Sequence, residues 1–275
     1  MLTILKVKES NRITLFERIF GAKAEAYIRN AGDITYLELI CDKNKKGIPW
    51  KKVVRLSLDC NGKILMPKGV EPPEHIGLER FFPSCYPSDL LFELLIEVMK
   101  KIKSKKHISL AICTSDFERA EKVLKQTVSL AADIRVISAF PEQMNLLQRK
   151  ILHETGAAVI VTDNAMACNG CNIIFAPEGL PSKVRGNEKS LIFAPCGKAK
   201  GLIVRWAEAQ MPIELAAVYD EAYDKTEFLA AFYELGESNG SNFLRPIIGK
   251  NIKESYSLEQ LSQYITKNIN IPTAE

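Results

Sequence analysis

Two cysteines separated by an Asn-Gly pair have the spacing of a metal-binding or redox-active pair. The segment Cys168-Asn-Gly-Cys171 can present two sulfurs to one metal ion or form a redox pair. A complete metal site needs further ligands, and the sequence has no second C-x-x-C and no matching histidine pair. Cys196 is the candidate third ligand, and Cys113 and Asp163 are expected near the same sheet edge. The alternative is that these cysteines are buried packing residues.

A turn rich in glycine and lysine is a second candidate site, for an anionic ligand or cofactor. It contains Gly197, Lys198, Lys200 and Gly201. The glycines free the backbone, and the lysines add positive charge before a helix expected at 199–210. A helix N-terminus attracts anions, so the turn favours phosphate, carboxylate or sulfate. The alternative is a plain solvated turn.

The turn at residues 113–119, where a dinucleotide-binding domain holds its pyrophosphate, has no glycine. Asp116 and Glu118 put negative charge there, and Ser115 with Glu118 predicts a capping box for the following helix. The sequence also lacks the G-x-x-x-x-G-K-[ST] pattern. These residues argue against binding of NAD, NADP or ATP at this turn.

Alternating strands and helices must position these sites. Apolar runs predict strands at 108–113, 134–138 and 157–161, and the segments between them predict helices at 117–130 and 141–154. This β-α-β-α-β order predicts an α/β fold with a Rossmann-like, doubly wound, mostly parallel sheet. In outline the order over residues 107–235 resembles the nucleotide-binding domains of small dehydrogenases, at the level of fold alone.

Two similar segments follow this unit. Residues 173–179 and 191–197 match at five of seven positions, and the polar linker between them is too short for a crossover helix. They predict two neighbouring strands joined by an exposed loop. We further expect a strand or buried segment at 213–219 and helices at 225–235 and 257–267.

The N-terminal part predicts a smaller, β-rich α+β domain. Strands are expected at 34–40 and 53–58, followed by an irregular connection with five prolines. The predicted organisation has three parts. These are a β-rich domain at 1–86, a linking helix at 87–106, and a Rossmann-like domain with a C-terminal helix at 107–275.

Charge is unevenly divided between the two halves of the chain. Residues 1–107 carry 20 lysines and arginines against 13 aspartates and glutamates, whereas the remainder is net acidic. The imbalance permits an anionic partner, but the scarcity of aromatic residues near the basic clusters argues against nucleic acid. The sequence has no signal-peptide pattern and no apolar run of membrane-spanning length. We therefore expect a cytoplasmic protein with reduced cysteines and no membrane partner, and leave a homo-oligomer open.

Two functions follow from these observations. The favoured hypothesis is a protein that binds a small anion or a partner protein on a degenerate Rossmann-like scaffold without a standard dinucleotide site. The alternative is a divergent enzyme, an oxidoreductase or a transferase, that uses the cysteine-rich C-terminal edge of the sheet. Nucleic-acid binding through the basic half ranks third.

Overall fold

The chain folds into two compact units. The computed structural model describes residues 1–9, 22–45, 47–57, 62–103, 105–236 and 243–269. The first unit combines Met1–Tyr86 with Met211–Phe243, and the second combines Pro87–Gln210 with Leu244–Glu275. The chain therefore leaves the second unit after Gln210, completes the first unit, and returns. The division expected from the sequence contains no such excursion.

A three-stranded sheet in the order β1-β3-β2 forms the centre of the first unit. Its strands are β1 (Leu2–Glu9), β2 (Ala24–Ala31) and β3 (Ile34–Lys43). β1 pairs with β3 in parallel, and β2 pairs with β3 in antiparallel orientation. The other elements are α2 (Trp50–Leu56), β4 (Lys63–Ile64), η1 (Glu74–Ile76), β5 (Glu79–Arg80), α6 (Ile213–Ala216) and α7 (Lys225–Leu235). This unit contains the smaller β-rich N-terminal part expected from the sequence.

The central strand of this sheet, β3, has buried residues on both faces, whereas the edge strand β2 is largely exposed. On one face, Leu5 and Leu39 share an apolar cluster with Val53 of α2. On the other, Tyr36 packs against Phe232 of α7, with ring centroids 5.5 Å apart. Successive residues of a strand point to opposite faces, so β3 supplies both layers.

Two of the predicted strands are helices. Residues 53–58 were expected to form a strand, but α2 covers most of them. Trp50, Val53 and Val54 have the i, i+3, i+4 spacing of a helix. An apolar run this short fits both the helical period of 3.6 residues and the strand period of two. The strand or buried segment expected at 213–219 is likewise wrong, because α6 begins directly after Pro212 and Leu215 is its buried residue.

Six parallel strands form the main sheet of the second unit, in the order β8-β7-β6-β9-β10-β11. The strands are β6 (Ser109–Cys113), β7 (Asp133–Ile137), β8 (Ile160–Thr162), β9 (Ile173–Phe175), β10 (Leu191–Phe193) and β11 (Leu202–Val204). In chain order the strands read 3-2-1-4-5-6, the order of dinucleotide-binding domains. The predicted Rossmann-like sheet is confirmed, and the two similar segments form the neighbouring strands β9 and β10.

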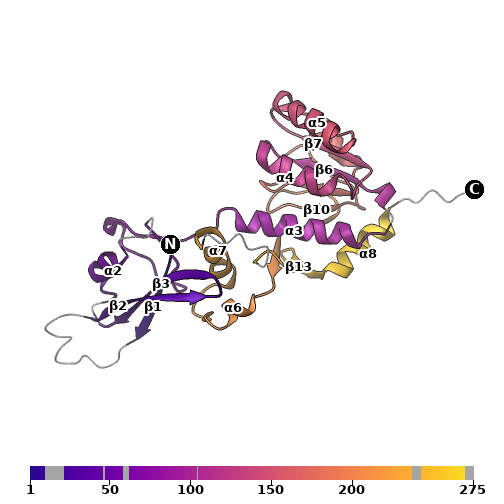
Figure 1. Ribbon diagram of the computed structural model, residues 1–275. Helices are drawn as coiled ribbons and strands as arrows, with labels where there is room; N and C mark the ends of the chain where they lie inside the picture. Colours follow the sequence, from indigo (N-terminus) through magenta and orange to yellow (C-terminus); the bar gives the residue numbers. More distant parts are fainter. Residues whose placement is uncertain (10–21, 46, 58–61, 104, 237–242, 270–275) are drawn as a thin grey trace, which may run out of the picture. The chain divides into compact units, whose positions relative to one another are not determined.

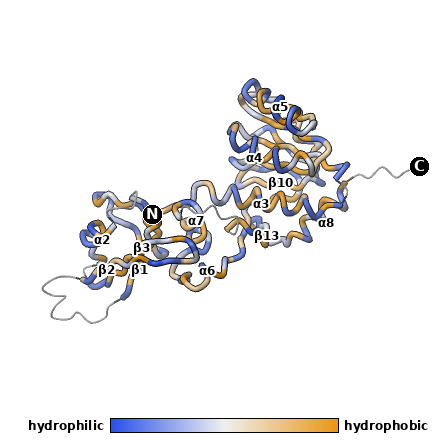
Figure 2. The backbone as a smooth tube through the Cα atoms, in the orientation of Figure 1, coloured by the Kyte–Doolittle hydropathy of each residue, from blue (hydrophilic) through white to orange (hydrophobic). Residues whose placement is uncertain are grey.

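Four helices cover one face of this sheet. They are α3 (Tyr86–Lys101), α4 (Phe117–Thr127), α5 (Pro141–Thr155) and α8 (Leu258–Asn268). Figure 1 shows them in a row, in the order α5, α4, α3 and α8. Phe92 of α3 packs on Phe175 of β9, with ring centroids 5.8 Å apart. Hydrophobic and hydrophilic residues alternate along the turns of α5 (Figure 2), as expected for a helix with one buried side.

The opposite face is covered by short irregular structure. It consists of η3 (Ala165–Gly170) and the chain between β9 and β10. Ala111 of β6 and Ile174 of β9 share a buried apolar cluster with Cys168 of η3 and Val184. The two faces of the sheet are therefore covered by very different kinds of structure. A further short helix, η2 (Lys105–His107), precedes β6.

A small antiparallel sheet completes the second unit. Its strands are β12 (Trp206–Ala209), β13 (Pro246–Lys250) and β14 (Ser255–Ser257). The helix predicted at 199–210 is wrong, because pairing with β10 and β13 draws this segment into β11 and β12 and overrides its local propensity. In the described ranges, no helix is both long and apolar enough to cross a membrane.

Candidate functional site

A pocket lies at the C-terminal edge of the six-stranded sheet. The chain following β6, β7, β8, β9 and β10 contributes to its lining. Its volume is about 650 Å³, which lies in the range of small-molecule sites. β6 and β9 are neighbours in the sheet, and the strand order reverses between them. Ligands of open α/β sheets bind at such a switch point.

In the turn after β6, the polar side chains bond to backbone N–H groups of the protein itself. Asp116 is the N-cap of α4, and its side chain accepts a bond from the backbone N–H of Arg119 at 3.0 Å. The predicted capping box is therefore wrong. Ser115 instead accepts the N–H of Ala139 at 3.1 Å, because its side chain faces the chain after β7. The carboxylate of Asp116 therefore accepts a helix N–H of the kind that a phosphate would use in a glycine-rich turn.

An ion pair crosses the switch point. Nη1 of Arg119, in the first turn of α4, donates to Oε1 of Glu178 at 2.8 Å. Glu178 follows β9, and the same oxygen accepts the hydroxyl of Thr114 at 3.1 Å. Both partners keep solvent access, with 26% of the Arg119 side chain and 46% of the Glu178 side chain exposed. An ion pair with this exposure contributes little to stability.

Two serine hydroxyls at the pocket can donate to a ligand. Ser115 and Ser138 both line it. Each accepts one backbone N–H at 3.1 Å, from Ala139 and Phe140 respectively, and each keeps its hydroxyl proton for a second bond. Ser138 is buried at the end of β7. In dinucleotide-binding domains the end of this strand contacts the ribose.

Cys113, which lines this pocket, and the predicted metal ligand Cys168 form a buried pair. The sulfur atoms of Cys113 and Cys168 lie 3.4 Å apart, and both side chains belong to the apolar cluster on the η3 face. Their hydrogen bond and burial raise the pKa of the Cys113 thiol, and the same bond lowers the pKa of Cys168. Burial raises the pKa of Cys171, in the same cluster, to about 11.

Cys196 has different surroundings. It is exposed and lines the pocket, as Asp163 also does. Within the part of the chain that the structure describes, no group of three or more His, Cys, Asp or Glu side chains is arranged to hold a metal ion. The metal site of Cys168, Cys171 and Cys196 stays a prediction, and their placement gives it no support.

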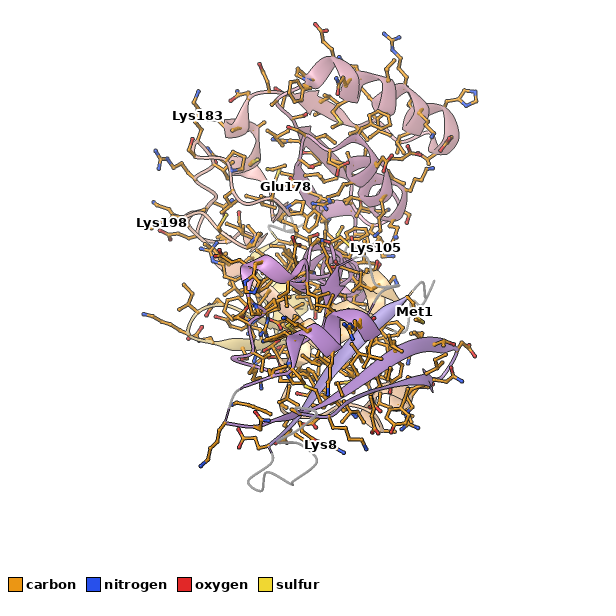
Figure 3. The ribbon with its side chains drawn as sticks, turned by 90° about the vertical axis from the view of Figure 1, so that its left-hand side faces the viewer. Met1, Lys8, Lys105, Glu178, Lys183 and Lys198 are labelled. Atoms are coloured by element: carbon orange, nitrogen blue, oxygen red, sulfur yellow. The ribbon has the colours of Figure 1, made fainter. Side chains whose placement is uncertain are left out.

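The predicted anion-binding turn lies outside the lining of this pocket. Gly197, Lys198, Lys200 and Gly201 precede β11, so no helix N-terminus follows them. Gly197 and Gly201 have φ of +99° and +111°, and an added Cβ would meet neighbouring chain segments. These glycines are therefore required by local packing. Figure 3 shows Lys198 extending outward, whereas Glu178 lies among other side chains.

Arg119, Glu178 and Ser138 were not among the site residues predicted from the sequence. One signal was present. The segments 173–179 and 191–197 share an Ile-Phe-Ala-Pro-x-Gly pattern, and the variable position is Glu178 in the first and Cys196 in the second. Both residues line the pocket. The differing position of the repeat was therefore the informative one.

Comparisons with known proteins give matches at the level of fold. No family model and no curated protein sequence matches the chain. Among solved structures, Δ1-pyrroline-2-carboxylate reductase from Thermococcus litoralis with NADH and L-proline is 12% identical over 64% of this chain and 59% of its own, with a TM-score of 0.31. Quinate dehydrogenase from Corynebacterium glutamicum with NAD is 8% identical over 71% and 80%, with a TM-score of 0.32. L-Tryptophan dehydrogenase from Nostoc punctiforme is 9% identical over 97% and 79%, with a TM-score of 0.34.

These neighbours correct two of the expectations from the sequence. The favoured hypothesis was a binding protein for small anions or partner proteins, whereas the structural neighbours are dehydrogenases and a reductase, the class of the enzyme alternative. The judgement against NAD and NADP is likewise not matched by these neighbours, since two of them hold NADH or NAD. That judgement rested on one glycine-free turn, whereas the pocket is built from the ends of five strands. The second unit is a Rossmann-like α/β domain.

Proposed function

We propose that the chain is a divergent oxidoreductase that binds a nicotinamide dinucleotide in the switch-point pocket. The observation that carries the proposal is the position of the pocket at the point where the 3-2-1-4-5-6 strand order reverses. When bound, a nicotinamide dinucleotide supplies hydride transfer.

The lining fits this group in a specific way. The glycine-free turn after β6 keeps the backbone at a distance, so a side chain would meet the phosphates, and Arg119 lies in the first turn of α4. The hydroxyls of Ser115 and Ser138 can donate to ribose or phosphate oxygens. Leu180 and Ala165 add apolar surface beside these polar groups, as is usual in cofactor pockets.

Titration of the purified protein with NADH and NADPH tests the proposal. We expect binding of at least one of them, measured by the change in nicotinamide fluorescence. Ala139→Trp places a large ring at an exposed pocket position and should weaken binding at least tenfold.

The matched control is Ala132→Trp. Ala132 is also exposed, and it precedes β7 at the opposite edge of the sheet, so the same substitution there should leave binding unchanged. Absence of dinucleotide binding by the unmodified protein, or equal effects of the two tryptophans, would contradict the proposal.

A further inference from the structure

The pocket is acidic except for one side chain. Of its lining residues in the described part of the chain, Asp116, Asp163 and Glu178 carry negative charge, and Arg119 carries the positive charge. A diphosphate would therefore need the Arg119 guanidinium, because the glycine-free turn does not offer its backbone. That guanidinium already holds Glu178.

Glu178 is held in place by the turn it belongs to. The residue after it, Gly179, has φ of +109°, and a Cβ at this position would collide with the sulfur of Cys196. Gly197 is fitted equally closely, with an added Cβ 2.6 Å from the Cβ of Leu180. The turns after β9 and β10 therefore fix each other and direct Glu178 across the switch point.

We propose that Arg119 is the phosphate-binding residue of the pocket and that Glu178 is the carboxylate a bound phosphate must displace. This inference rests on the proposed dinucleotide function and names the residues that set affinity in that site. The guanidinium is planar and matches either a carboxylate or a phosphate, but two anions on one cation repel each other. Exchange is local, because Glu178 and Arg119 are partly exposed and joined through one oxygen.

The experiment compares the unmodified protein with Glu178→Gln, Arg119→Gln and the double variant. Dissociation constants for NADH, NADPH and inorganic pyrophosphate are measured by calorimetry. Glu178→Gln keeps the size of the side chain and removes its charge. Without the Glu178 carboxylate competing for Arg119, the dissociation constants of all three ligands should fall about tenfold. Arg119→Gln should weaken binding and, in the double variant, cancel the gain.

The control is Glu154→Gln. Glu154 is exposed in the last turn of α5 and is absent from the pocket lining. It removes the same charge from the same unit, so it should leave all three dissociation constants unchanged. Thermal unfolding of each variant verifies that it folds.

The outcomes separate the two proposals. If dinucleotides bind and Glu178→Gln binds them no more tightly, the dinucleotide function stands and the exchange mechanism is overturned. If pyrophosphate alone binds, and does so more tightly to Glu178→Gln, the exchange stands and the dinucleotide function fails. If neither ligand binds to any variant, both are overturned.

Discussion

The two segments 173–179 and 191–197 have the same local structure but place different functional groups at the pocket. Each forms a buried strand, β9 or β10, followed by a turn with a glycine at positive φ. The shared residues build the strand and the turn, and the one polar difference places a carboxylate or a thiol at the pocket. The backbone repeat therefore positions the site, and the variable residue gives it its chemistry.

The largest expected effect tests whether the second turn needs its glycine. Gly197→Ala should lower the free energy of unfolding by about 3 kcal/mol, because φ of +99° is strained for alanine and the new Cβ would meet Leu180. Gly156→Ala is the control, since Gly156 has φ of +74° but nothing within 4 Å of an added Cβ. It should cost about 1 kcal/mol. If urea unfolding gives the same loss of free energy for Gly197→Ala and Gly156→Ala, the turns after β9 and β10 are not closely packed.

A second prediction separates the buried thiols from the exposed one. Cys168→Ser should lower the free energy of unfolding by about 2 kcal/mol, because it places a hydroxyl in an apolar cluster. Cys196→Ser, at the exposed turn, should change it by less than about 0.5 kcal/mol. Denaturant titration of both variants measures the difference. A stable Cys168→Ser protein would mean that this cluster contains a partner for the hydroxyl.

A double-mutant cycle measures the contact between the two segments. Gly179→Ala alone brings its Cβ against the sulfur of Cys196. Cys196→Ala removes that sulfur, so the double variant should recover about 1 kcal/mol relative to the sum of the single changes. The strain from φ of +109° at residue 179 should remain. Additive effects would show that the turns are independent.

Alkylation compares the reactivity of the exposed and buried thiols and has the smallest expected effect on stability. Iodoacetamide should modify Cys196 in the folded protein, while Cys168 and Cys171, both buried, should react only after unfolding. The raised pKa of Cys171, about 11, adds to its protection. Peptide mass spectrometry gives the modified fraction at each residue. Bound NADH should slow the reaction at Cys196, and an unchanged rate would place the dinucleotide away from this turn.

Local signals predicted the elements that are specified locally. α5 covers Pro141–Thr155, close to the predicted 141–154, with proline in its first turn and Gly156 at φ of +74° after its end. α8 covers the predicted 257–267 almost fully and has the capping box of Ser257 and Gln260. Residues 199–210 gave the wrong answer because their partners, β10 and β13, lie outside the segment.

The site was harder to predict than the fold. Glu178 and Arg119 are 59 residues apart in the chain, and neither lies in a pattern that names the other. Strand order brings them together, and the order could be inferred only as a fold class. The cysteines could be recognised as candidates by residue type. That Cys168 and Cys171 are buried and Cys196 is exposed depends on the tertiary structure.

The excursion of the chain into the first unit has a consequence during synthesis. β1 and β3 leave the ribosome early, but the ring of Phe232 that covers Tyr36, and the hydroxyl of Tyr223 that bonds to the carbonyl of Leu5 at 2.8 Å, belong to residues 211–243. All six strands of the Rossmann-like sheet are made before those residues. The first unit to begin synthesis must therefore wait for one layer of its core, with β1 and β3 lacking these contacts while the six-stranded sheet emerges.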